Sequence, residues 1–269
     1  MSDDLRLFLE PELREPYMVV GFHGWPNGGE VSSGVLTYLI TRLGAGKLGE
    51  IAPSRFYDFT SKRPQVRYRD GVLRSYEMPR NEFYYAEQAV GRGLILFLGH
   101  EPNLNWMDYV EAILHVVERF RVVRVFTVGG LLDRVPHTVE PLVSFATNSE
   151  RVLDRLRMLD LEPTDYEGPS SVHSLILYRC RELGVEAISL WGHSPYYLSG
   201  ADLQTIYHVA RRLLELMEVS LDLHDLKLQS EAYRERLDAE MSSNHELRRL
   251  VAELEGEYQL SRRRPDYVS

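Results

Sequence analysis

The most constraining feature of this chain is an apolar run near its middle that stops at two glycines. Residues 122–128 read VVRVFTV and include a single charge, which is typical of a strand covered on both faces. Gly129 and Gly130 come next. We expect the strand to end there, because glycine allows a turn with positive φ or a close approach of two backbones. In open α/β sheets, crevices form at the carboxyl ends of strands, so we expect the middle of a sheet and any site at this point.

Apolar segments of the same kind occur at 17–22, 93–98 and 185–190, and stretches with helical spacing of apolar residues lie between them. One such stretch, at 106–120, joins the second segment directly to the central strand. This succession of strand, helix and strand has the spacing of a right-handed crossover between parallel strands. The chain therefore predicts an α/β fold class with a mostly parallel central sheet.

Shorter and more mixed strands are expected at 55–60 and 72–78, near the edge of the sheet. Asp70 and Gly71 precede the second of them and form a hairpin signal. Residues 66–69 alternate apolar and basic side chains, which indicates a strand with one exposed face.

The character of the chain changes near Val219. Residues 223–258 are strongly charged, contain no proline, and space their apolar residues by threes and fours. This narrow seam fits a long helix on its own domain, and equally a helical hairpin or a helix that packs on another subunit. We predict an α/β domain at 1–220, a charged helical extension at 221–260 and a disordered tail at 261–269.

Composition excludes several classes of protein. The net charge is −9, so the chain carries no overall basic footprint for nucleic acid. Cys180 is the single cysteine, which excludes an internal disulfide and a cysteine zinc cluster. No apolar run approaches the roughly 18 residues of a membrane span. We expect a cytoplasmic protein that does not enter a membrane.

Histidines, acids and glycines gather at the predicted strand ends, which lie along one edge of the sheet if the strands are parallel. None of them has a metal-ligand spacing such as HExxH, and no GxSxG segment is present to seat a nucleophilic serine. We therefore expect no metal, no cofactor and no catalytic residue among them. The candidate strand-end pocket consists of His23, His100, Glu101, Gly129, Gly130, Asp133, His137 and His193.

Five segments, in this order and spacing over most of residues 1–220, resemble the PAC2 family, the proteasome assembly chaperone 2-like proteins of archaea and bacteria. The extension that ends in LVAELE also resembles bacterial members. The five segments are GFHGWPN at 21–27, GHEP at 99–102 with Trp106, GG at 129–130 with VPHT at 135–138, YEGPS at 166–170, and WGHSPYYL at 191–198.

The resemblance implies a three-layer α/β/α fold, similar to nucleoside-phosphorylase-like domains. It also implies homo-oligomers, with a trimer favoured, and a non-enzymatic, chaperone-like role toward proteasome α subunits. One feature departs from the family. Archaeal assembly chaperones dock through a C-terminal hydrophobic-Tyr-any residue motif, whereas here Tyr267 is not penultimate and Asp266 precedes it. That departure argues against docking through the tail.

Three hypotheses follow. The first is an oligomeric binding protein that assists assembly of a proteasome-like or other multi-subunit complex. The second is an enzyme or small-molecule sensor whose pocket lies at the strand ends, with polar contacts from the histidines and acids named above. The third is a scaffold that acts only through the helical extension.

Overall fold

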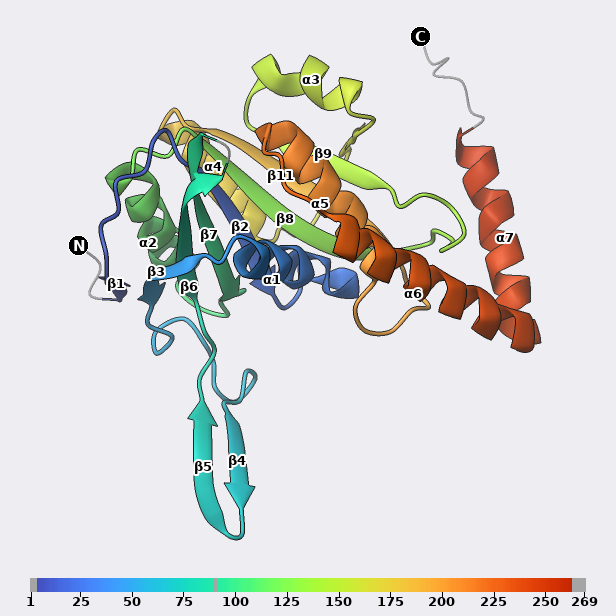
Figure 1. Cartoon of the computed structure of the whole chain (residues 1–269), viewed down its shortest axis with the longest axis horizontal. Helices are drawn as coiled ribbons and strands as arrows, with labels where there is room; N and C mark the ends of the chain where they lie inside the picture. The colour runs from blue at the N-terminus through green and yellow to red at the C-terminus, as the bar shows by residue number, and fades with distance from the viewer. Residues whose placement is uncertain (1–3, 90, 263–269) are drawn as a thin grey trace.

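A computed structural model describes residues 4–89 and 91–262 of the chain. Within them, nine strands form one sheet in the order β1-β3-β6-β7-β2-β8-β11-β9-β10 (Figure 1). The four central strands, β7, β2, β8 and β11, run parallel to one another. The flanking strands β6 and β9 are antiparallel to their central neighbours. The strands are β1 (Leu5–Leu7), β2 (Tyr17–His23), β3 (Gly46–Ile51), β6 (Glu82–Ala89), β7 (Arg92–His100), β8 (Arg124–Asp133), β9 (Val143–Thr147), β10 (Glu162–Pro163) and β11 (Glu186–Pro195).

Helices cover both faces of this sheet, because its central strands are apolar on both sides. Val19 and Phe126 pack with α1 and α5, whereas Val20 and Val125 pack with α2 and α4. This alternation follows the period of two of a strand. The α/β/α class predicted from the sequence is confirmed. The helices are α1 (Val31–Arg42), α2 (Trp106–Arg119), α3 (Leu153–Met158), α4 (Val172–Glu182), α5 (Leu203–Met217), α6 (His224–Ser243) and α7 (His245–Arg262), with 3-10 turns at Gly28–Glu30 and Glu150–Val152.

The prediction that the central strand ends at its two glycines is wrong. Strand β8 continues through Gly129 and Gly130 to Asp133. A Cβ on Gly129 would lie 2.6 Å from the ring of Trp191, and a Cβ on Gly130 would lie 2.2 Å from the carbonyl oxygen of Gly28. The two glycines thus serve the close approach of neighbouring groups, and neither has the positive φ of a turn.

The predicted edge strands are also corrected. Residues 55–60 form turns and irregular backbone instead of a strand. They pack as an irregular segment because Phe56 and Tyr57 are buried in the core. The Asp70–Gly71 signal does mark a hairpin, but its strands β4 (Gln65–Arg69) and β5 (Val72–Glu77) form a separate two-stranded sheet. This hairpin projects away from the body of the molecule, so both of its faces are exposed (Figure 1).

The charged extension consists of two helices that meet at Asn244, where the backbone is extended. Helix α6 packs beside α5, and Leu237, Val251 and Leu254 are buried at the inner side of the pair. The extension thus forms two helices, and the first of them lies on helix α5 of its own domain. Residues 261 and 262 belong to the end of α7, and the rest of the tail expected at 261–269 lies outside the described residues. Neither these two helices nor any other described helix is long and apolar enough to cross a membrane.

One buried histidine in the first turn of α4 makes the core sensitive to acid. His173 is 1% exposed and lies between the rings of Phe22 and Trp191. Both of its ring nitrogens lack a hydrogen-bond partner within the described chain. Burial lowers the pKa of His173 from 6.5 to about 3. The imidazole is therefore neutral in the folded protein at pH values above about 3.

We expect His173→Phe to flatten the pH dependence of stability. Between pH 6.5 and about 3 the unfolded chain binds a proton at His173 and the folded chain does not, so stability falls as pH falls. Each such histidine contributes a slope of about 1.4 kcal/mol per pH unit in this range. Urea unfolding should show no difference in slope between pH 8 and 6.5, and from pH 6.5 to 5 a slope for the variant that is shallower by about this amount. An unchanged slope would contradict the assignment.

A second test concerns the close approach at the sheet centre. Gly130→Ala places a methyl group against a backbone carbonyl, so we expect a loss of about 3 kcal/mol or more in the free energy of unfolding. The matched control is Gly256→Ala in α7, where the added Cβ meets no atom within 4 Å. That change should stabilise by about 1 kcal/mol through helix propensity. Equal effects in thermal unfolding would show that Gly130 is not a packing constraint.

Candidate functional site

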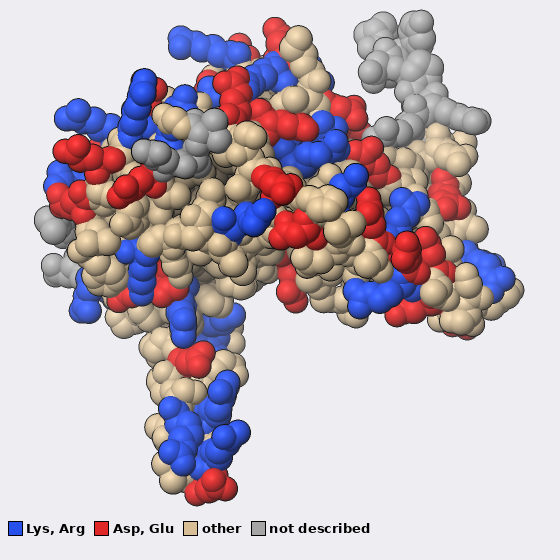
Figure 2. All heavy atoms as spheres, viewed as in Figure 1, with Lys and Arg blue, Asp and Glu red and all other residues tan. Residues whose placement is uncertain are grey.

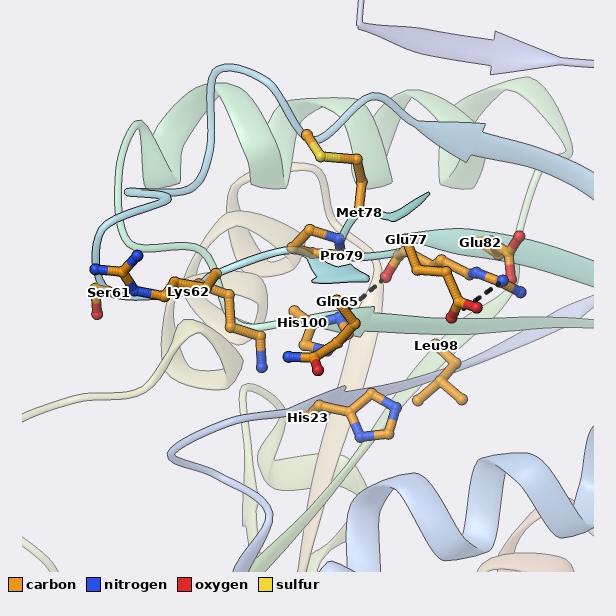
Figure 3. A pocket seen from close by; sticks show the side chains of 12 residues that line it. His23, Ser61, Lys62, Gln65, Glu77, Met78, Pro79, Glu82, Leu98 and His100 are labelled. Carbon is orange, nitrogen blue, oxygen red and sulfur yellow. Dashed lines mark hydrogen bonds and ion pairs between the residues drawn. The ribbon is translucent and has the colours of Figure 1, made fainter. Parts of the chain in front are cut away.

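A cavity of about 520 Å³ opens at the carboxyl ends of β2 and β7, beside the base of the β4–β5 hairpin (Figure 3). Its floor comes from the sheet and its walls come from the two segments that lead into and out of the hairpin. The lining residues are His23, Ser61, Lys62, Arg63, Gln65, Glu77, Met78, Pro79, Arg80, Glu82, Leu98 and His100.

Two stacked imidazoles form the floor. His23 and His100 are the last residues of neighbouring parallel strands and stand opposite each other in the register. Side chains at paired positions of adjacent strands lie on the same face, so the register brings the rings together. Their centroids are 4.7 Å apart with an angle of 30° between the planes.

Both imidazoles are held in the neutral form. Burial, with smaller contributions from the charges of Lys62 and His23, lowers the pKa of His100 to about 4. Burial and Lys62 also lower the pKa of His23. Nδ1 of His100 lies 3.3 Å from the carbonyl oxygen of Arg80 and donates to it, which leaves Nε2 as an acceptor.

Buried Asn81 fixes the position of His100 from behind. Its Oδ1 accepts from the hydroxyls of Tyr57 at 2.6 Å and Tyr109 at 2.9 Å, and from the backbone N–H of His100 at 3.1 Å. Its Nδ2 donates to the carbonyl of Ile51. This network makes the floor of the cavity rigid.

The charges in the walls are unevenly paired. Glu82 accepts from Lys47 at 2.7 Å, and Glu77 lies 3.8 Å from Arg80. Among the described residues, neither Lys62 nor Arg63 makes an ion pair. The cavity therefore combines two neutral imidazoles with two cations that have no carboxylate partner, an arrangement suited to holding an anion.

Asp133 and His193 form a second group, on β8 and β11. Nδ1 of His193 donates to Asp133 at 2.7 Å, and its Nε2 lies 2.9 Å from the hydroxyl of Ser144 on β9. The hydrogen bond from His193 lowers the pKa of Asp133. This is the connectivity of a serine hydrolase triad. However, Ser144 lies within a strand and is only 9% exposed, so the contacts chiefly tie three strands together.

His137 lies under the helical extension. It is 3% exposed, its backbone N–H donates to the hydroxyl of Tyr197 at 2.8 Å, and its Nε2 lies 3.5 Å from Asp238 of α6. Burial lowers the pKa of His137. Nearby, Arg134 pairs with Glu257 of α7 at 3.0 Å. His137 thus joins the central loop to the extension.

Glu101 does not line the cavity beside His100. Its Oε1 accepts from the backbone N–H of Val172 at 3.0 Å and so satisfies the start of α4. Burial raises the pKa of Glu101.

The eight residues of the sequence-based pocket therefore divide among separate places. Only His23 and His100 line the large cavity. Sequence reasoning missed Lys62, Asn81 and Ser144, because their roles depend on contacts with segments distant in the chain.

Comparison with known proteins agrees with this fold. The sequence model of the PAC2 family matches residues 21–241. A proteasome-assembly chaperone homologue of Mycobacterium tuberculosis is 28% identical over 87% of this chain and 99% of its own, with a TM-score of 0.80. A PAC2 family protein of Streptomyces avermitilis is 28% identical over 89% of this chain and 99% of its own, with a TM-score of 0.77.

PbaB, an archaeal proteasome activator of Pyrococcus furiosus, shares the fold at 22% identity and a TM-score of 0.69, over 87% of this chain and 97% of its own. A search of the curated proteins gave no significant match. The family match spans most of the chain, and the structures at 28% identity share its fold over nearly their whole length. This chain belongs to the PAC2 family.

Proposed function

We propose that this chain is a non-enzymatic, oligomeric binding protein of the cytoplasm that assists assembly of a multi-subunit complex. Proteasome α subunits are the clients that we favour, and a trimer is the oligomer that we favour. The observation that carries the proposal is the β4–β5 hairpin, whose apolar face has no partner within the described chain.

The hairpin has one apolar face. Its register pairs Val66 with Tyr76 and Tyr68 with Leu73, so these four side chains lie on the same side of the ribbon. They are between 49% and 63% exposed. A two-stranded hairpin without a packed face is marginally stable in water. Another protein surface over this face would supply the missing burial.

The opposite face of the hairpin is basic. Arg67 and Arg69 alternate with the apolar residues, and Figure 2 shows Lys and Arg gathered along the hairpin. The segment from Lys62 to Arg80 holds six basic and two acidic residues, whereas the whole chain has a net charge of −9. Tyrosine and arginine are enriched at protein interfaces. An acidic protein surface, including that of another copy, complements the hairpin.

The related structures support a role in the assembly of a proteasome-like complex. One structure at 28% identity is described as a proteasome-assembly chaperone homologue, and structures at lower identity include a proteasome activator. The proposed contact uses the hairpin and does not require the C-terminal residues. A hairpin rich in arginine and tyrosine could also bind nucleic acid. However, the acidic remainder of the chain would repel the phosphate backbone.

We expect the double variant Val66→Ser/Tyr76→Ser to lose both self-association and client capture. The change removes apolar area from the exposed face and leaves the domain core untouched. Native mass spectrometry of the full chain should show the oligomer shift to smaller species. Pull-down with purified proteasome α subunits should fall by at least about ten-fold, or about 1.4 kcal/mol.

The matched control is Met158→Ser on α3, which removes an apolar side chain that is 83% exposed elsewhere on the surface. It should leave both readouts unchanged. A wild-type monomer that captures no α subunit, or a hairpin variant with wild-type mass and capture, would overturn the proposal.

The non-enzymatic part of the proposal is tested at Ser144. Because this hydroxyl is nearly buried within a strand, we expect no labelling by a fluorophosphonate that reacts with activated serines. Labelling of the wild type that disappears in both Ser144→Ala and His193→Ala would instead identify a hydrolase.

A further inference from the structure

We propose that the cavity between His23, His100 and Lys62 binds a small ligand that carries a phosphate or carboxylate group. The proposed function leaves this cavity unused, so the inference stands independently of it.

The cavity has positive charge that no carboxylate in the described chain neutralises. Lys62 extends into the cavity beside His100 (Figure 3). Arg63 is also a lining residue. Lys62 acts on both imidazoles by its charge. Within the described residues neither cation has an acidic partner, so an oxyanion would gain charge-assisted hydrogen bonds without breaking an existing ion pair.

The negative charges of the cavity lie away from Lys62, which restricts where an anionic group could bind. Glu77 and Glu82 lie at the opposite side of the cavity, paired with Arg80 and Lys47. They repel an anion from that side. The oxyanion is therefore directed to the side with Lys62 and the two imidazoles.

The volume of the cavity fits a ligand larger than a single inorganic ion. A cavity of about 520 Å³ is within the usual range of roughly 300–1,000 Å³ for small-molecule sites. A single inorganic ion would fill little of it. Gln65, Met78, Pro79 and Leu98 offer mixed polar and apolar surface to the remainder of a metabolite-sized ligand.

The two imidazoles should make ligand binding pH-dependent, which a surface lysine alone would not do. The charged groups that act on His23 are Lys62 and Glu30. His100 is acted on by Lys62 and His23, bonds to the backbone carbonyl of Arg80, and has the ring of Tyr57 at its edge. A bound oxyanion would offset the charge of Lys62 and raise the pKa of both histidines. Binding should therefore take up protons and strengthen as the pH falls from 6 toward the lowered pKa of His100, about 4.

The experiment is isothermal titration of the full chain with pyrophosphate, inorganic phosphate and succinate, each in two buffers of different ionisation enthalpy. We expect saturable binding of at least one probe with net proton uptake. Stronger binding of the phosphates than of succinate would identify a phosphoryl ligand, and the reverse order would identify a carboxylate.

Lys62→Gln should weaken that binding by at least about ten-fold. His100→Gln should abolish most of the proton uptake. Lys227→Gln, which removes a lysine of α6 paired with Glu231, is the matched control and should bind as the wild type does. Thermal unfolding of each variant verifies that the fold is intact.

Absence of saturable binding for all three probes would overturn the proposal. Equal affinity in Lys62→Gln and the wild type would do the same, because the ligand would then occupy another surface. Neither result would affect the hairpin proposal, since the apolar face of the hairpin is not part of the cavity.

Discussion

The packing of the turn after β2 onto strand β8 is the constraint on which the rest of the structure depends. The backbone N–H of Gly130 donates to the carbonyl of Pro26 at 2.9 Å, and Asn27 forms an isolated bridge to Gly130. A side chain at Gly130 would collide with this turn. The contact carries α1 across one face of the sheet, and it leaves His23 at the strand end, beside β7 and His100.

This arrangement places three separate groups of polar side chains along one edge of the sheet. The side with β2 and β7 holds the cavity with its paired imidazoles. The side with β8, β9 and β11 holds the Asp133–His193–Ser144 contacts, which tie strands of opposite direction together. His137, from the loop between β8 and β9, meets the helical extension. The polar motifs of the sequence thus line a cavity, join strands and contact the extension, respectively.

The parts that the sequence predicts well are those set by local periodicity. The apolar runs of β2, β7, β8 and β11 identify the parallel centre of the sheet, and their shared ends predict that His23 and His100 lie at one edge. Tertiary contacts decide the remainder. Gly129 and Gly130 allow either a turn or a close approach, and only the structure shows that they leave room for Trp191 and the backbone of Gly28. The 65–77 hairpin alternates apolar and polar residues as an ordinary edge strand does. This alternation does not predict that the hairpin forms a sheet of its own. Lys62 faces His100 only because the hairpin base folds over β7.

The central claim is that the apolar face of the hairpin is covered by protein in the functional state. Hydrogen exchange of the peptides from residues 63–78 tests it most directly, measured on the full chain at low and at high protein concentration. Our account predicts fast exchange of these amides in dilute solution and clear protection in concentrated solution, with unchanged protection in α2 and α4. Fast exchange of the hairpin at every concentration, and also with α subunits added, would contradict it.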